Sequence, residues 1–289
     1  KGQPMTSILI LNVNGRQHLQ KCLLALPAFT KTPHEIIVID NGSSDGSQDY
    51  LRTVGVRNLT VVENPENIGC PPARAQGMAL AKGDYVVLLD NDTIVTAGWL
   101  TRLIGHCEND PKIGLLGPST NYITGPQRVP GVKYTDLQSL AGIAAQTATH
   151  FAGMLQPTTR LVGFCMFIRR AVIDRIGCCD ATFGKYGFED DDYSYRAILA
   201  GFDAYIARDV FIHHTGNSGH VDAGLDYPTY VREAWSVFHA KWGFPANMTV
   251  EDYGKNPAKY MPERAFDVTT DYIPLPDVGE IEACITRRP

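Results

Sequence analysis

Short apolar runs alternate with segments of helical periodicity through the first 120 residues of the chain. The apolar runs predict buried strands at 7–12, 35–39, 59–63, 85–89 and 113–117. Between them, helices are predicted at 16–26, from near Ser47, at 71–82 and at 97–107. This order of elements predicts an α/β fold with a Rossmann-like, mostly parallel central sheet flanked by helices.

Polar residues follow three of these predicted strands. Asn14, Asp40 and Asp90 each lie just past the apolar part of a strand. Because ligands bind at the carboxyl ends of the strands in an open parallel sheet, we expect these three side chains to share one ligand-binding edge.

The second half of the chain is less regular. Residues 119–160 contain many turn residues, so we expect a long loop that covers the substrate side. Strands are predicted at 161–168 and 204–213, and helices at 171–176, 190–200 and 231–241. We divide the chain into a ligand-binding half (5–118), a smaller mixed half of the same domain (119–242) and a C-terminal extension (243–289).

Composition narrows the class of protein. Of 289 residues, 44% are hydrophobic and 20% charged, which supports a sizeable core and argues against global disorder. A net charge of −5 argues against a nucleic-acid-binding protein. No apolar stretch reaches the roughly 18 residues of a membrane span, and no apolar secretion signal precedes Met5, the expected native start. Seven cysteines without a C-x-x-C pair indicate buried, reduced thiols, so we expect a cytoplasmic protein.

The strongest local candidate for chemistry is Asp90-Asn91-Asp92, directly after an apolar strand. Two carboxylates one residue apart at the edge of a sheet can both face a hard divalent cation, which prefers oxygen ligands. The alternative is an acidic turn that only ends the strand.

Four consecutive acids, Glu189 to Asp192, form a second candidate. Acids at the start of a helix cap it and complement its dipole, which accounts for one or two of them. The others fit general base catalysis on a substrate hydroxyl or further metal ligation.

Two smaller candidates complete the set. His213 and His214 follow an apolar run, and because neighbours on a strand face opposite sides, one of them can point into a site as a ligand for Mn²⁺. Arg74 lies in the first turn of a helix preceded by Gly69, where it could reach a phosphate. A backbone-satisfied histidine and a solvated arginine are the alternatives.

In order along the chain, these pieces resemble the family-2 nucleotide-sugar glycosyltransferases of the GT-A fold, from about Ser7 to Gly219. The resemblance rests on 39–47, 67–69 with Ala73 and Arg74, 83–85 leading to Asp90-Asn91-Asp92, Phe188-Glu189-Asp190 with Arg196, and His213 with Gly216 and Ser218. Residues 5–118 then correspond to the half that binds the sugar donor, and 119–242 to the half that binds the acceptor and carries catalysis.

The resemblance also implies roles. Asp40 matches the carboxylate that reads the donor base, Asp190 the general base, and Glu189 a contact to a sugar; the run of acids leaves the base open among Glu189, Asp190 and Asp191. Metal ligation is implied for Asp90, Asp92 and one of the two histidines, His213 in the first place and His214 as the alternative. Donor binding is expected from Asn14, Asp40, Asn41, Arg74, Asp90, Asn91 and Asp92.

The implied reaction is an inverting transfer of a sugar from a nucleoside diphosphate to a hydroxyl acceptor. The resemblance implies Mn²⁺ or Mg²⁺ as cofactor, a UDP- or dTDP-sugar as the favoured donor, and a glycan, a lipid-linked molecule or a protein as acceptor. Peripheral association with the cytoplasmic face of a membrane stays open, as does the oligomeric state.

Two other interpretations compete. The apolar strand followed by Asp90-Asn91-Asp92-Thr93 also resembles the D-x-D-x-T nucleophile motif of haloacid-dehalogenase-like phosphatases, although the threonine comes one residue earlier; Asp90 would be the nucleophile and Asp92 the acid and base. That motif normally lies on the first core strand, whereas about three strand–helix units precede it here. The second is a catalytically inactive module that binds a nucleotide or glycan, against which intact Asp90, Asp92 and Asp190 argue.

Overall fold

Strands and helices alternate in the computed structural model, which describes residues 2–216 and 226–286. The first half contains β1 (Thr6–Asn12), α1 (Arg16–Phe29), β2 (His34–Asn41), α2 (Ser47–Thr53), β3 (Leu59–Asn64), α3 (Cys70–Leu80), β4 (Tyr85–Asp90), β5 (Thr93–Ile94), α4 (Trp99–Asn109) and β6 (Ile113–Thr120). The second half contains α5 (Leu137–His150), β7 (Leu155–Pro157), β8 (Cys165–Arg169), α6 (Arg170–Ile176), η1 (Ala181–Phe183), α7 (Glu189–Leu199) and β9 (Asp203–His214). The C-terminal part contains α9 (Tyr227–Trp242), α10 (Val250–Lys255), η2 (Pro257–Tyr260), α11 (Val268–Asp271), α12 (Val278–Glu282) and β10 (Ile285–Thr286).

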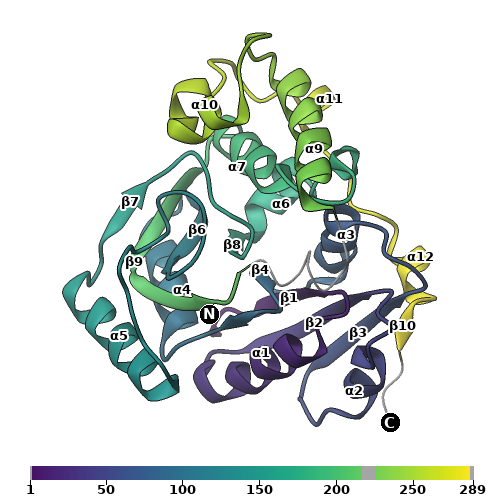
Figure 1. Cartoon of the computed structure of the whole chain (residues 1–289), viewed down its shortest axis with the longest axis vertical. Helices are drawn as coiled ribbons and strands as arrows, with labels where there is room; N and C mark the ends of the chain where they lie inside the picture. Colours follow the sequence, from purple (N-terminus) through teal and green to yellow (C-terminus); the bar gives the residue numbers. More distant parts are fainter. Residues whose placement is uncertain (1, 217–225, 287–289) are drawn as a thin grey trace.

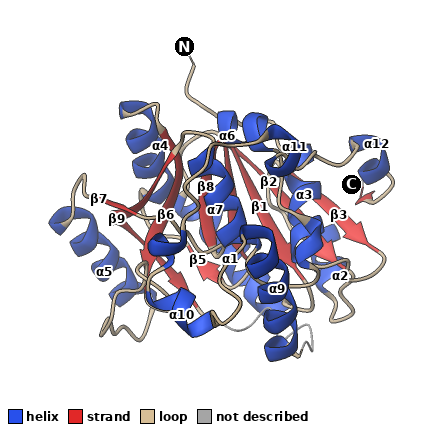
Figure 2. Cartoon of the chain, turned by 90° about the horizontal axis from the view of Figure 1, so that it is seen from above, coloured by secondary structure: helices blue, strands red, loops and turns tan. Residues whose placement is uncertain are grey.

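One sheet runs through both halves of the chain (Figures 1 and 2). Its strand order is β10-β3-β2-β1-β4-β8-β6-β9-β5, with β7 paired to β9. The strands β3, β2, β1 and β4 are parallel, whereas β8 lies antiparallel between β4 and β6. The parallel part thus comes from the first half of the chain, whereas the mixed part combines β6 of the first half with β8 and β9 of the second.

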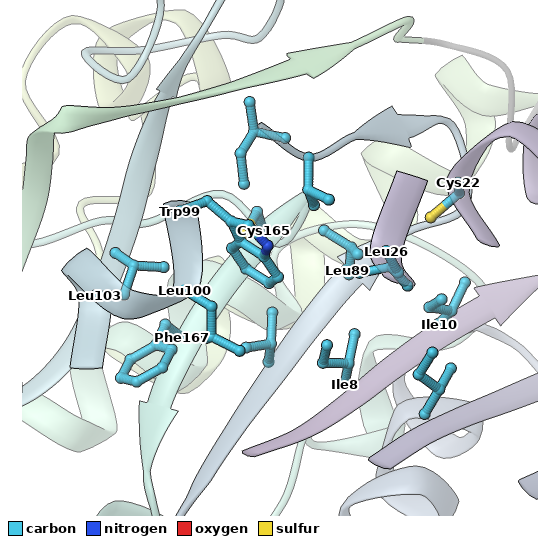
Figure 3. Close-up of a cluster of buried hydrophobic side chains, with 14 of the residues drawn as sticks. Ile8, Ile10, Cys22, Leu26, Leu89, Trp99, Leu100, Leu103, Cys165 and Phe167 are labelled. Atoms are coloured by element: carbon cyan, nitrogen blue, oxygen red, sulfur yellow. The ribbon is translucent and has the colours of Figure 1, made fainter. Parts of the chain in front are cut away.

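The sheet is covered on both faces because its central strands are apolar on both sides. Ile8 and Ile10 of β1 belong to a core that includes side chains of α1 and α4, such as Trp99 (Figure 3). Leu9 points to the other face, where the core is built with α3, α6 and α7 and includes Met78. This two-sided packing fixes the carboxyl ends of the strands, on which the site is built.

A separate aromatic cluster joins α9 and α10 to the start of α7. Phe238 of α9 is fully buried and packs against Phe188, with ring centroids 5.2 Å apart, and against Tyr253 of α10, at 5.3 Å. Figure 1 shows α7, α9 and α10 together at one end of the molecule, with α1 and α2 at the other. The C-terminal segment thus packs against the start of α7.

The structure corrects the expectation of a long loop at 119–160. Fourteen residues of this segment form α5, which packs on β9 through Leu140 and Ala144, and β7 adds a short edge strand. The strand predicted at 161–168 is shorter and later, since β8 begins at Cys165. The two-residue strand β5 was not expected.

Two expectations from composition can be compared with the structure. None of the seven cysteines is in a disulfide; six are buried and Cys284 is partly buried. None of the helices in the described ranges has the length and apolar character needed to cross a lipid bilayer.

Candidate active site

Three side chains that could hold a metal ion meet where β4 and β9 end. Asp90 is the last residue of β4, and the pairing of β5 with the end of β9 brings Asp92 beside His214. Nε2 of His214 lies 3.2 Å from Oδ1 of Asp92 and 3.7 Å from Oδ2 of Asp90. One ligand atom from each of the three residues lies within 4.8 Å of the others. Two carboxylate oxygens and one imidazole nitrogen suit Mn²⁺ or a similar divalent cation.

The protonation of this cluster reflects its burial and its charges. Burial raises the pKa of Asp90, and the nearby charge of Asp92 raises it further, against the lowering effect of Arg74 and His214. Burial alone would lower the pKa of His214, but its hydrogen bond to Asp92 and the two carboxylate charges raise the pKa above the ordinary value. A bound cation would take the place of these protons.

The structure corrects the choice between the two histidines. His213 was the first candidate ligand, but its side chain leaves β9 on the opposite side from His214. Its Nδ1 lies 2.5 Å from the hydroxyl of Tyr134, and it is not part of the three-residue cluster. His214 is therefore the histidine that can bind a metal with Asp90 and Asp92, and Ser218 of the same motif lies outside the described residues.

The four consecutive acids, Glu189 to Asp192, differ in the groups that they contact. Phe188 precedes them with a left-handed backbone (φ 62°), after which α7 begins at Glu189. Asp192 is fully buried and pairs with Arg196 at 2.7 Å, which is the role of a structural ion pair within the helix. Asp191 is also buried, and its Oδ1 lies 2.8 Å from Nε of Arg160.

Asp190 differs from its neighbours. Its oxygens accept hydrogen bonds only from backbone amides among the described residues, those of Gly163 at 2.8 Å and Asp191 at 2.9 Å. It is partly exposed and lines the central cavity. A carboxylate with this access can accept a proton from a bound hydroxyl group.

Arg74 joins the two groups of acids. Its Nη1 donates to Oε1 of Glu189 at 3.0 Å, and its Nη2 donates to Oδ1 of Asp90 at 3.1 Å and to the carbonyl of Gly163 at 2.9 Å. Burial raises the pKa of Glu189 and so does Asp190, while Arg74 lowers it. The arginine is buried between acids, so its first role in this structure is to hold β4 and α7 together.

These groups surround one cavity of about 490 Å³. Its walls include the predicted site residues Asn41, Arg74, Asp90, Asn91, Asp92, Glu189, Asp190, Asp191 and His214. They also include Asn67 of the 67–69 motif and five residues that carry no motif in the sequence, namely Arg128, Arg160, Lys185, Tyr186 and Tyr253. Arg160 and Tyr253 escaped sequence analysis because they lie in the irregular segment and in the tail, and only folding brings them here.

Asp40 and Asn14 lie outside the cavity wall. Asp40 is fully buried and accepts hydrogen bonds from Asn12 (2.9 Å), the Ser43 amide (3.0 Å) and Gln48 (3.1 Å). Asn14 accepts a hydrogen bond from the amide of Ser44 at 2.7 Å. In this structure both residues hold the turn after β2, whereas Asp92 and Asp190 share the cavity.

Asn41 lines the cavity, but hydrogen bonds within the protein occupy the polar atoms of its side chain. Its Nδ2 donates to Asn67 and to the carbonyl of Gly69, and its Oδ1 accepts from Asn64 and from the amide of Ile68, at 2.9 to 3.2 Å. An amide side chain has two donor hydrogens and two acceptor lone pairs, so none is left for a ligand. Asn41 therefore positions the turn before α3.

Comparison with known proteins agrees with this arrangement. Residues 7–177 match the family described as Glycosyl transferase family 2. The chain is 29% identical over 217 residues to Glycosyltransferase AglE of Haloferax volcanii. The aligned segment covers 72% of this chain and 66% of that protein. It is 27% identical to the poly-β-1,6-N-acetyl-D-glucosamine synthase of Staphylococcus aureus, over 68% of this chain and 46% of the synthase. The chain thus spans about two thirds of the first relative and less than half of the second.

A solved structure is similar over most of the chain. GalNAc-T7, crystallised with UDP, GalNAc and Mn²⁺, superposes with a TM-score of 0.59 at 20% identity, covering 96% of this chain and 59% of that one. This likeness supports the GT-A fold. The family match favours neither of the two alternatives, and the place of Asp90 on the fourth strand along the chain argues against the phosphatase interpretation. The matched segment covers more than half of the sequence, and the chain belongs to glycosyl transferase family 2.

Proposed function

We propose that the protein is a metal-dependent, inverting glycosyltransferase that moves a sugar from a nucleoside diphosphate to a hydroxyl group of an acceptor. The observation that carries this proposal is the meeting of Asp90, Asp92 and His214 in the cavity that Asp190 also lines. Asp90, Asp92 and His214 can hold a cation, and Asp190 can accept a proton.

Asp90, Asp92 and His214 would hold Mn²⁺ or Mg²⁺, and their two oxygens and one nitrogen fit that choice. Such a cation neutralises the charge that develops on the diphosphate leaving group. Arg74 keeps Asp90 in position through its bond to Oδ1, and the amide of Gly216 does the same for Asp92 at 3.0 Å.

Asp190 is the proposed general base, because Glu189 and Asp191 are held by the arginines Arg74 and Arg160. Removing the proton of the acceptor hydroxyl as it attacks gives a single displacement at the sugar carbon, which inverts its configuration. The backbone amide of Gly163 orients the carboxylate.

UDP and dTDP are the proposed donor nucleotides, and the UDP in the crystal structure of GalNAc-T7 supports this choice. Reading of the base by Asp40 requires the turn at 43–48 to move, since that side chain is fully buried. The proposed acceptor is a glycan, a lipid-linked molecule or a protein; the name of the staphylococcal synthase favours a glycan. A cytoplasmic location and peripheral membrane association are part of the same proposal.

A screen of UDP-, dTDP- and GDP-sugars for Mn²⁺-dependent thermal stabilisation tests the proposal, because a ligand of the native state raises apparent stability. Asp92→Asn should abolish Mn²⁺-dependent stabilisation by the donor. Asp190→Asn should keep it and lower turnover by about 10²–10⁴-fold. Asp49→Asn is the matched control, since that side chain is 84% exposed on α2. Equal loss of donor affinity in Asp92→Asn and Asp190→Asn would contradict this division of roles.

A further inference from the structure

Two arginines in the cavity wall, Arg128 and Arg160, have guanidinium nitrogens that form no hydrogen bond with the described residues. Nε of Arg160 lies 2.8 Å from Asp191, but neither terminal nitrogen of Arg160 makes a hydrogen bond to any residue that the structure describes. Arg128, an exposed residue, also lines the cavity, and within 2–216 and 226–286 no hydrogen bond of its side chain is found. An arginine whose donors face a cavity is suited to a planar anion.

Hydrogen bonds join the two segments that carry these arginines. The amide of Thr120 donates to the carbonyl of Gln127 at 2.9 Å, and the amide of Val129 donates to the carbonyl of Thr120 at 2.8 Å, which closes a turn around Arg128. The buried side chain of Gln127 accepts a hydrogen bond from the amide of Val162 at 2.8 Å, two residues after Arg160. The positions of both arginines are thus set by buried contacts rather than by a loose loop.

Their place in the cavity separates them from the metal ligands. Arg160 pairs with Asp191, the neighbour of the proposed base, while Arg74 serves Asp90 and Glu189. The diphosphate of the donor has the cation site for its charge. Arg160 therefore contacts the residue next to the proposed base Asp190, and the bond from Val162 to Gln127 joins its segment to the turn that carries Arg128.

We propose that the acceptor carries an anionic group, a phosphate or a carboxylate, which Arg128 and Arg160 bind while the acceptor hydroxyl lies at Asp190. This inference rests on the proposed function and narrows its acceptor class. The cavity wall also includes the apolar residues Ile123 and Val250.

The test measures binding of small anions by calorimetry with Mn²⁺ and UDP, or whichever nucleotide the donor screen selects, at saturation. The probes are sn-glycerol 3-phosphate, glucuronate and, as the neutral control, glucose; the first two distinguish a phosphate from a carboxylate. The variants are Arg128→Gln and Arg160→Lys, which keeps the charge opposite Asp191 but loses the fork of donors. Lys133→Gln, an exposed cation outside the cavity wall, is the control.

We expect one of the anions to bind the wild type, glucose not to bind, and Arg128→Gln and Arg160→Lys each to weaken the anion by about tenfold. Lys133→Gln and the nucleotide affinity should not change. The inference is overturned if neither anion binds, if Lys133→Gln weakens the anion as much, or if Arg128→Gln weakens the nucleotide instead. In those cases Mn²⁺-dependent nucleotide binding still supports the proposed function, whereas its absence for every nucleotide overturns both.

Discussion

A chain of side-chain hydrogen bonds joins the acidic turn after β4 to Asp40. Nδ2 of Asn91 donates to Oδ1 of Asn12 at 2.7 Å, and Nδ2 of Asn12 donates to Asp40 at 2.9 Å. Gly15 leaves room for this contact, since a methyl group on it would lie 2.2 Å from Nδ2 of Asn91. The proposed metal site and the proposed base-reading residue are therefore mechanically linked through two amides.

Gly15→Ala should weaken the donor without unfolding the protein. The added methyl group displaces Asn91 and breaks its bond to Asn12, so we expect about a tenfold loss of Mn²⁺-dependent nucleotide affinity, equivalent to one good hydrogen bond. Calorimetric titration with UDP measures this. Gly55→Ala is the control, because open space surrounds that glycine. An unchanged affinity in Gly15→Ala would show that the link has no part in donor binding.

Asp191 should make the stability of the protein depend on pH. Burial raises the pKa of its carboxyl to about 7, with a further rise from Asp190 and a lowering by Arg160. Between the ordinary pKa and this value, the folded protein keeps a proton that the unfolded chain releases. The free energy of unfolding should therefore fall as pH rises from about 4 to about 7, by on the order of a few kcal/mol.

Urea unfolding across this pH range measures the slope. Asp191→Asn should reduce the slope because it removes one titrating group, while Glu189, whose pKa is also raised, still contributes. Asp49→Asn should keep the slope of the wild type. An identical slope in Asp191→Asn would mean that this carboxyl is ionised throughout.

At the scale of elements, strong periodicity made most of the fold predictable. The bounds of the strands predicted at 7–12, 35–39, 59–63 and 85–89 agree with the structure within two residues, because buried parallel strands are apolar on both faces. The helix α5 was missed because its exposed side carries small, neutral residues, so hydrophobic contrast is weak; its capping box at Asp136 and Ser139 was the available signal. β5 is too short for any pattern, yet it brings Asp92 to His214.

Candidate site residues could be predicted from the sequence where they belong to a short motif. Asp90, Asp92 and Asp190 were found because each follows a strand or starts a helix, at a place where polar side chains are unusual. The sequence alone could not decide whether His213 or His214 lies beside Asp92, because this depends on the pairing of β5 with β9. Nor could it predict the burial of Asp40, which depends on hydrogen bonds such as the one from Asn12. Arg160 and Tyr253 reach the cavity through contacts with Asp191, which lies 31 and 62 residues away from them in the sequence. No local sequence pattern encodes such contacts.

The helix α9 should support the catalytic turn through Phe238. Its ring is fully buried against Phe188, the residue that starts α7 in a left-handed conformation. Phe238→Ala should lower the free energy of unfolding by about 3–5 kcal/mol and also lower turnover, because the turn before Asp190 loses its support. Urea unfolding and sugar transfer measure the two effects. Leu24→Ala, at a side chain 61% exposed, should change neither.

At the scale of the whole molecule, the last 44 described residues, 243–286, do two separate things. Tyr253 lines the cavity and donates a hydrogen bond to Asp191 at 2.6 Å. Further on, Ile281 of α12 is buried in the core that α3 covers, and β10 pairs with the outer strand β3. Figure 1 shows α10 at the catalytic end and α12 with β10 at the edge of the sheet. The segment expected to be an extension therefore contributes both to the cavity and to the edge of the fold.

Two variants should separate these roles. Tyr253→Phe keeps the ring but removes the hydrogen bond to Asp191, so we expect turnover to fall by about tenfold through loss of the positioning of Asp190, with a stability loss of only about 1 kcal/mol. Ile281→Ala leaves a cavity in the core, and we expect a loss of about 2–5 kcal/mol with turnover unchanged at temperatures where the variant is folded. Unfolding in urea and sugar transfer on the same preparations give both readouts. If Tyr253→Phe affected stability alone, its hydroxyl would have no part in positioning Asp190. If Ile281→Ala lowered turnover in the folded protein, the sheet edge and the cavity would be coupled, and the C-terminal segment would act as one unit.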